Sequence, residues 1–159
     1  MAKPTVYIET SVISYFVGRP SKNLLTTTRQ QITRRWWIEY LPVCDPCISI
    51  AVENEIRDGD ATMAAKRLVA ASSFPLLPLG DTIDRVIEAL LKRRLVPAKS
   101  PTDAAHLAFA AVHGVDFLAT WNFRHLANPF ILPQVRRLCQ EFGCRLPEVC
   151  SPEQLLASR

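Results

Sequence analysis

The 159-residue sequence is poor in glycine. Its only five glycines are Gly18, Gly59, Gly80, Gly114 and Gly143. No two of them have the spacing of a G-x-G-x-x-G dinucleotide-binding loop or of a G-x-x-x-x-G-K-[ST] phosphate-binding loop. The G-x-S-x-G turn of α/β-hydrolases is also missing. The sequence therefore excludes these classes of nucleotide-binding and hydrolytic protein.

Long apolar runs and an export signal are missing as well. No stretch approaches the roughly 18 uninterrupted apolar residues of a membrane span, so no membrane association is expected. The start, Met1-Ala2-Lys3-Pro4, lacks the apolar segment of a signal peptide. The five cysteines are an odd number, which fits reduced thiols better than a disulfide framework. We therefore expect a cytoplasmic protein.

Cys44-Asp45-Pro46-Cys47 has the C-x-x-C spacing of redox and zinc sites. No second C-x-x-C or histidine pair accompanies it, and it precedes an expected strand instead of opening a helix. Incidental thiols are the favoured interpretation. A thiol redox protein stays a third alternative, and it would require a depressed thiol pKa.

The remaining composition is that of an ordinary globular protein, with 48% hydrophobic and 21% charged residues. The length is close to the roughly 150 residues expected per domain, so residues 1–159 are interpreted as one domain. Nineteen basic and fifteen acidic residues give a net charge of +4. This charge mildly favours a polyanionic partner without proving one.

Hydrophobic patterning predicts short strands that alternate with helices. Strands are expected at 6–8, 47–48, 74–79 (an edge strand) and 117–120. A helix is expected from Ser21 to Pro42, with Leu25, Ile32 and Trp36 on one face. Another is expected from Ser100 to Gly114, where Ser100 and Asp103 form a capping box. Further helices are expected after Ser49 and at 61–71, 81–94 and 134–142. The pattern predicts an α/β fold, with a central parallel sheet of about four or five short strands covered by helices on both faces.

Four polar residues are expected to meet at one edge of this sheet. Glu9 ends the first strand, and Asn122 follows the 117–120 strand. Glu55 and Asp103 lie near the starts of two helices. Strand-to-helix turns of a parallel sheet share one edge, and ligands bind there. Asp116 belongs to the opposite edge, and Glu53 is expected to pair with Arg57 on a solvated helix face.

Each of the four residues also has a purely structural interpretation, Asp103 as a helix cap and Asn122 as a loop residue. One divalent ion would explain all four. Carboxylates packed together repel one another and raise one another's pKa, whereas Mg²⁺ or Mn²⁺ favours oxygen ligands. We therefore expect Glu9, Glu55 and Asp103 to be metal ligands.

Four segments are similar to one known family. They are residues 6–13 (VYIETSVI), Glu55-Ile56, residues 103–108 (DAAHLA) and residues 118–126 (LATWNFRHL). In order and spacing the chain resembles PIN-domain ribonucleases, particularly the VapC-like toxins of type II toxin–antitoxin systems. In that family the first acid is usually Asp, where this chain has Glu9, and the position of Asn122 is often Asp. His106 has no role that the resemblance assigns.

The resemblance implies a single PIN-like domain that cleaves RNA with Mg²⁺ or Mn²⁺, forms a homodimer and binds an antitoxin. It makes Glu9, Glu55, Asp103 and Asn122 the expected catalytic residues. The metal would lower the pKa of a bound water and orient it toward a phosphodiester. The alternative is a degenerate PIN domain that only binds RNA or a protein partner.

Several other side chains are expected to contact the RNA. Positioning of the phosphate or of metal-bound water is expected from Thr10, Ser11 and Thr120. Contacts to the RNA backbone are expected from Arg29, Arg34, Arg35, Arg124 and the run Lys92–Arg94. Trp36, Trp37 and Trp121 are candidates for base stacking, although a tryptophan on a helix face such as Trp36 is more often in the core.

Overall fold

A computed structural model describes residues 2–158 of the chain. Its elements, in order, are β1 (Thr5–Ile8), α1 (Thr10–Val17), α2 (Leu24–Glu39), the short 3₁₀ helix η1 (Leu41–Val43), β2 (Asp45–Cys47), α3 (Ile50–Ile56), α4 (Ala61–Ala71), α5 (Asp81–Lys92), α6 (Pro101–Val112), β3 (Phe117–Ala119), α7 (Leu132–Glu141), β4 (Glu148–Cys150) and α8 (Pro152–Ala157). The predicted α/β class is confirmed. No helix in the part of the chain described is long and apolar enough to cross a membrane.

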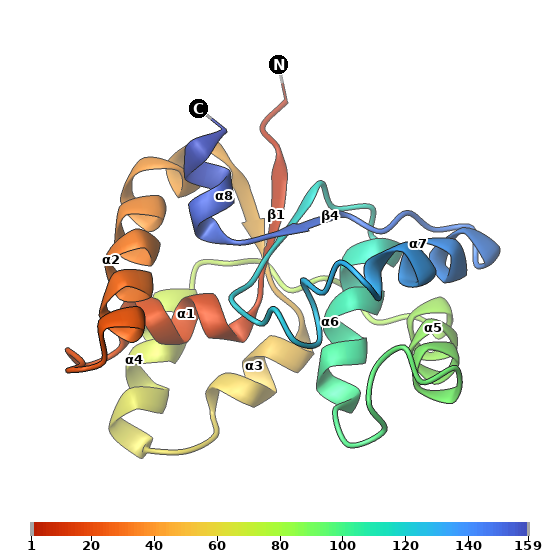
Figure 1. Cartoon of the computed structure of the whole chain (residues 1–159), viewed down its shortest axis with the longest axis horizontal. Helices are drawn as coiled ribbons and strands as arrows, with labels where there is room; N and C mark the ends of the chain where they lie inside the picture. The colour runs from red at the N-terminus through yellow and green to blue at the C-terminus, as the bar shows by residue number, and fades with distance from the viewer. Residues whose placement is uncertain (1, 159) are drawn as a thin grey trace.

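The sheet has four strands, all parallel, in the order β2-β1-β3-β4. Helices α1, α2, α4 and α8 lie on one side of the strands in Figure 1, and α5, α6 and α7 lie on the other. The central strand β1 is an unbroken apolar run in which Val6, Tyr7 and Ile8 have no exposed surface. Such a run is typical of a parallel strand that is covered on both faces.

The strand order places the expected ligand edge between β1 and β3. From β1 the chain adds β2 on one side, then returns across β1 to add β3 and β4 on the other. Ligands bind outside the carboxyl ends of the strands at such a switch point. Glu9 follows β1 directly, and Thr120 follows β3. Asp116 lies at the opposite edge as predicted, where it accepts bonds from the Thr5 amide (2.8 Å) and hydroxyl (3.0 Å).

Helix α2 begins later and packs differently than the sequence suggested. It starts at Leu24 instead of Ser21, because the Asn23 carboxamide oxygen caps it by accepting a hydrogen bond from the Thr26 amide at 3.0 Å. Trp36 is buried as predicted, but Leu25 is 59% exposed. The expectation that Leu25 belongs to the buried face was therefore wrong.

The predicted edge strand at 74–79 is a further correction. Only Leu76 pairs with the sheet, in a single parallel bridge to Ile48. Pro75 and Pro78 lack amide hydrogens, so the segment cannot form a longer ladder. Strand β2 begins two residues and ends one residue earlier than expected, and it accommodates Pro46 because it is an edge strand.

The last strand and the last helix were not expected from the sequence. Strand β4 pairs with β3, and α8 packs against α2. A full capping box starts α8: the Ser151 hydroxyl accepts from the Gln154 amide at 3.2 Å, and the Ser151 amide donates to the Gln154 side chain at 2.9 Å. The S-x-x-Q signal was present in the sequence.

Replacing the cap residue should weaken this end of the fold. We expect Ser151→Ala to lower the free energy of unfolding by about 1 kcal/mol, because the Gln154 amide loses its acceptor, the hydroxyl of the buried Ser151. Urea unfolding followed by far-ultraviolet circular dichroism measures the change. Ser158→Ala, at the exposed end of the same helix, is the control and should cost less. Equal stability of the wild type and Ser151→Ala would contradict the capping role.

Candidate active site

Glu9 is a buried carboxylate held by the start of helix α1. It is the N-cap residue of α1, and its side chain is 6% exposed. One carboxylate oxygen accepts from the Ser11 amide at 2.9 Å. The other accepts from the hydroxyls of Ser11 and Thr120, both at 2.5 Å. Three donors thus compensate the desolvation of this charge.

The same bonds tie the ends of β1 and β3 together. The Ser11 hydroxyl oxygen accepts from the Trp121 amide at 2.9 Å, and the Thr120 hydroxyl oxygen accepts from the Asn122 amide at 2.9 Å. Each hydroxyl therefore donates to Glu9 and accepts from the backbone beyond β3. This sets the position of the chain at Asn122.

Helices α3 and α6 bring Glu55 and His106 to the same place. The Nε2 atom of His106 lies 3.0 Å from a carboxylate oxygen of Glu55 and 4.0 Å from the nearer oxygen of Glu9. His106 is fully buried, whereas the Glu55 side chain is 32% exposed. Glu55 therefore connects the buried network with solvent.

Tyr7 and Ser49 continue the hydrogen-bond network on the other side of the His106 ring. Its Nδ1 is 2.8 Å from the Tyr7 hydroxyl, and that hydroxyl is 2.7 Å from the Ser49 hydroxyl. Tyr7 is buried on β1, and burial raises its pKa well above the usual value, so it remains a neutral phenol. Both ring nitrogens of His106 thus have partners, and these partners fix the orientation of the ring.

The charges in this network are coupled. Burial opposes protonation of His106, but the Glu55 hydrogen bond and the charges of Glu9, Glu55 and Asp103 outweigh it and raise the His106 pKa. Burial likewise opposes ionisation of Glu55, but its bond to His106 and the charge on His106 lower the Glu55 pKa. The histidine therefore acts as an internal cation for the carboxylates.

Asp103 lies at the same edge but in a neighbouring pair of contacts. One carboxylate oxygen is 2.9 Å from Nδ1 of His125, and the other accepts from the Asn122 side-chain amide at 3.4 Å. Asn122 in turn accepts from the His125 amide at 3.0 Å. The Ser100 side chain makes no cap hydrogen bond, so the expected capping box is absent. Asp103 contacts His125 and Asn122 instead.

The four residues expected at the site thus gather at one edge but in two groups. Glu9 and Glu55 form one group with His106, and ligand atoms of these three lie within 4.8 Å of one another. Asp103 and Asn122 form the other group with His125. Asp103 is close enough for its charge to act on His106.

The residues of the first group fit a divalent cation. Two ligands of one ion with bonds of about 2.1 Å lie about 3.0 Å apart when adjacent and about 4.2 Å apart when opposite. The His106 Nε2 lies 3.0 Å from the Glu55 oxygen and 4.0 Å from the Glu9 oxygen, which is within this range. The Thr10 hydroxyl points to the same conclusion: it is buried and lacks a hydrogen bond of normal geometry among the described residues. It lies close enough to Glu55 to help lower that pKa.

The chemistry of this group also discriminates between metals. Two carboxylates and an imidazole form a mixed oxygen and nitrogen set. An imidazole nitrogen suits a transition metal, whereas Mg²⁺ is usually bound by oxygens and water. Of the two ions expected from the sequence, the mixed set favours Mn²⁺.

Three residues expected to bind substrate have other roles in this structure. Thr120 has no exposed surface, and its hydroxyl serves Glu9 and Asn122. Arg34 donates to the carbonyl oxygens of Phe16 (3.3 Å) and Gly18 (2.9 Å), where it satisfies the end of α1. Arg35 pairs with Glu39 on the exposed face of α2. The structure therefore favours structural roles for Thr120 and Arg34 over direct contact with RNA.

Ser11 and Arg124 are accessible beside the site. Thr10 and Ser11 begin α1 next to Glu9; Ser11 is partly exposed, whereas Thr10 is buried. Arg124 is exposed two residues beyond Asn122. The Glu53–Arg57 pair forms on the outer face of α3 as predicted, at 2.7 Å.

The thiol redox alternative is contradicted by the local environment. Burial raises the pKa of the Cys47 thiol to about 12, the opposite of what a reactive thiol needs. The Cys44 thiol points to the Tyr40 carbonyl oxygen at 3.4 Å.

His106 and His125 were not among the residues expected at the site. The D-x-x-H spacing of Asp103 and His106 can indicate a metal pair, because residues three apart share a helix face, but the family resemblance assigns His106 no role. A histidine inside an otherwise apolar helix requires a buried partner, and this was the available signal. Comparison with models of known protein families and with curated proteins gives no match for this chain.

The raised pKa of His106 predicts how stability depends on pH without metal. The stabilisation by the imidazolium is full below about 6.5, the pKa of an unfolded histidine, and is lost as pH rises through the higher folded value. In EDTA, the free energy of unfolding should fall as the pH rises above about 6.5, and His106→Gln should reduce that slope. Urea titrations measure it.

Exposed His113 provides the matched control for this slope. Its ring contacts the carbonyl oxygen of Pro78 at 2.7 Å, away from the carboxylates. His113→Gln should leave the pH dependence as in the wild type. A slope that His106→Gln does not change would contradict the internal-cation role.

Proposed function

We propose that this chain is a divalent-metal-dependent endoribonuclease. The observation that carries the proposal is the meeting of Glu9, Glu55 and His106 within 4.8 Å, at the switch point of a parallel sheet. These residues come from three distant elements, and their charges are costly to bury together without a function or a cation. The resemblance of the sequence to PIN-domain ribonucleases supports RNA as the substrate.

Each residue has a defined part in this mechanism. Glu9, Glu55 and His106 would hold the ion, with Tyr7 orienting His106 from behind. The ion, when bound, lowers the pKa of a water and offsets charge on the phosphoryl oxygens. Asp103 and His125 flank this position, and Asn122 holds Asp103 in place.

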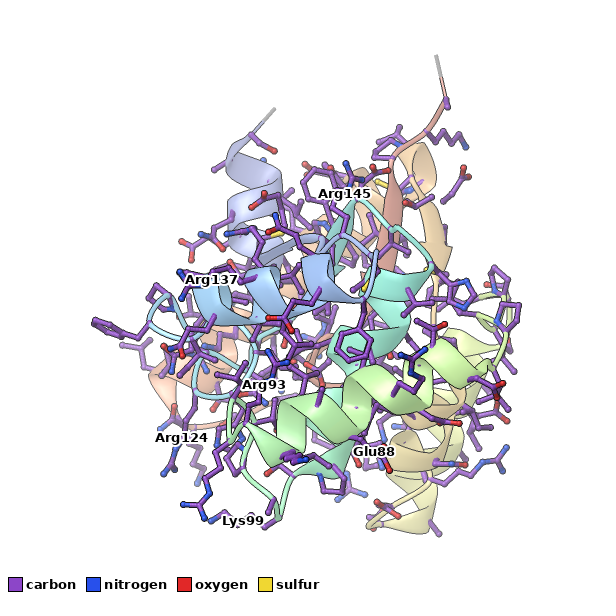
Figure 2. The ribbon with its side chains drawn as sticks, turned by 90° about the vertical axis from the view of Figure 1, so that its right-hand side faces the viewer. Glu88, Arg93, Lys99, Arg124, Arg137 and Arg145 are labelled. Carbon is purple, nitrogen blue, oxygen red and sulfur yellow. The ribbon has the colours of Figure 1, made fainter. Side chains whose placement is uncertain are left out.

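Cations near this edge would bind the RNA backbone. Figure 2 shows Arg124 and Lys99 projecting at the lower left, with Arg93 and Arg137 above them on the face of α5 and α7. Arg124 and Lys99 are exposed and form no ion pair among the residues described, whereas Arg93 is held by Glu141 at 2.6 Å. The first two are therefore the better phosphate ligands.

The resemblance extends the proposal to the biological setting. A VapC-like toxin would act on RNA in the cytoplasm, form a homodimer and be held inactive by an antitoxin. The net charge of +4 is compatible with a polyanionic substrate.

A second candidate is a degenerate PIN domain that binds RNA or a protein partner without cleavage. It is favoured by the completeness of the network: Glu9 already has three hydrogen-bond donors, and His106 already balances Glu55. A site of this kind is stable without an ion. Metal binding distinguishes the two candidates.

Mn²⁺ should stabilise the protein through Glu55. At a hundredfold excess over Kd we expect about 2.7 kcal/mol, or roughly 5–10 °C in melting temperature for a domain of this size, with a smaller effect of Mg²⁺. Glu55→Gln should abolish the shift because it removes a charged ligand that is not part of the core. Glu53→Gln, on the same helix but paired outward with Arg57, should retain it. A flat titration of the wild type would favour the binding module.

Cleavage should depend on the same carboxylate. We expect Glu55→Gln to reduce Mn²⁺-dependent cleavage of a single-stranded RNA by at least about a hundredfold, and Glu53→Gln to leave it unchanged. Denaturing gels of an end-labelled RNA, with proteins purified in parallel, give the rates. Equal rates for Glu55→Gln and the wild type would remove this site from the reaction.

A further inference from the structure

The tryptophans do not supply the exposed ring that base stacking needs. Trp36 is fully buried, and Trp121 is 5% exposed with its indole nitrogen donating to the Thr33 hydroxyl at 2.8 Å. Trp37 stacks on Phe16 with ring centroids 4.0 Å apart. The expectation that Trp121 stacks a base directly is therefore wrong, and its ring serves the core.

Phe123 is an exposed aromatic ring beside the acidic edge. It directly follows Asn122 and is 43% exposed. The Arg29 guanidinium lies 5.2 Å from the centroid of Phe123 and 5.3 Å from that of Trp121. The two rings meet edge to face, with centroids 6.0 Å apart and planes at 75°. The buried Trp121 thus supports both the exposed ring and the cation.

Residues 121–123 connect Phe123 and Arg29 to the acidic site. The Trp121 amide donates to the Ser11 hydroxyl, which donates to Glu9. The next residue, Asn122, bonds to Asp103, and Phe123 comes after it. Helix α2 is fixed to the same run, because Thr33 accepts from Trp121 and donates to the carbonyl oxygen of Arg29 at 2.6 Å. The distance from Phe123 to the carboxylates is therefore structurally constrained.

Phe123 also forms part of the wall of a cleft of about 410 Å³. Its other walls are the apolar Ala127, Pro129, Leu132 and Val149 and the polar Ser151, Glu153 and Gln154. Small-molecule sites usually have volumes of about 300–1,000 Å³ and combine apolar walls with a few polar groups. A planar base fits this description. Positive charge close to Phe123 comes from Arg29, which lies against its ring, and from the adjacent exposed residue Arg124, and this charge favours the phosphates of an RNA strand.

We propose that Phe123 and Arg29 form a stacking platform for a base of single-stranded RNA next to the acidic site. This inference rests on the proposed ribonuclease function. Every base offers a π-face, so the platform binds without reading sequence. A paired base in a duplex cannot lay its face on Phe123, so the platform selects unpaired strands.

Fluorescence anisotropy with a labelled ten-residue oligouridylate in EDTA tests the platform. Phe123→Leu should weaken binding about fivefold or more because the aromatic face is lost, while Phe123→Tyr should retain it. The slope of log affinity against log salt should not change, because no phosphate contact is removed. Arg124→Gln is the matched contrast, and it should reduce that slope by about one.

An oligomer of the same length made of abasic residues separates base from backbone contacts. The wild type and Phe123→Leu should bind it equally. Melting curves serve as the folding control, because Phe123 is an exposed position. If the wild type binds the oligouridylate and Phe123→Leu binds it equally well, the platform is overturned while the ribonuclease proposal stands. If the wild type neither binds RNA nor cleaves it with Mn²⁺, both fail.

Discussion

The site depends on one electrostatic constraint, the burial of the Glu9 carboxylate at the end of the central strand. A charge in this position is tolerated only when donors and cations surround it. Helix α1 supplies the Ser11 amide, the chain after β3 supplies Thr120, and α6 supplies His106. The elements that form the site are therefore also the elements that this charge holds together.

His106 gives the network two ways to be balanced. As an imidazolium it neutralises the carboxylates from within, and as a neutral ring it could join them in holding a metal ion. The Tyr7 hydroxyl can accept from the other ring nitrogen in both cases. The same geometry thus serves a protein with or without a cation. Metal binding therefore distinguishes an enzyme from a binding module.

The edge of the sheet was predictable because it follows from short-range patterns. Alternating strands and helices place Glu9 and Asn122 at the ends of parallel strands, and this needs no knowledge of packing. The partners of the charges were not predictable in this way. His106 bonds to Tyr7, 99 residues away, and to Glu55, 51 residues away. Arg34 looked like a surface cation because the carbonyl oxygens of Phe16 and Gly18 that it satisfies belong to another helix end. Long-range contacts of this kind are properties of the fold.

Glu9 and Asn122 differ from the aspartates that are usual at the similar positions of PIN-domain ribonucleases, and both residues have a defined place in these contacts. The longer side chain of Glu9 allows one carboxylate to cap α1, accept from Thr120 and still lie 4.0 Å from His106. Asn122 faces Asp103, and its amide donates to that carboxylate while its oxygen accepts from the His125 amide. A carboxylate at position 122 could accept the second bond but could not donate the first, and it would place two negative charges side by side. With one neutral amide between Asp103 and His125, the edge keeps its hydrogen bonds and carries three carboxylates instead of four.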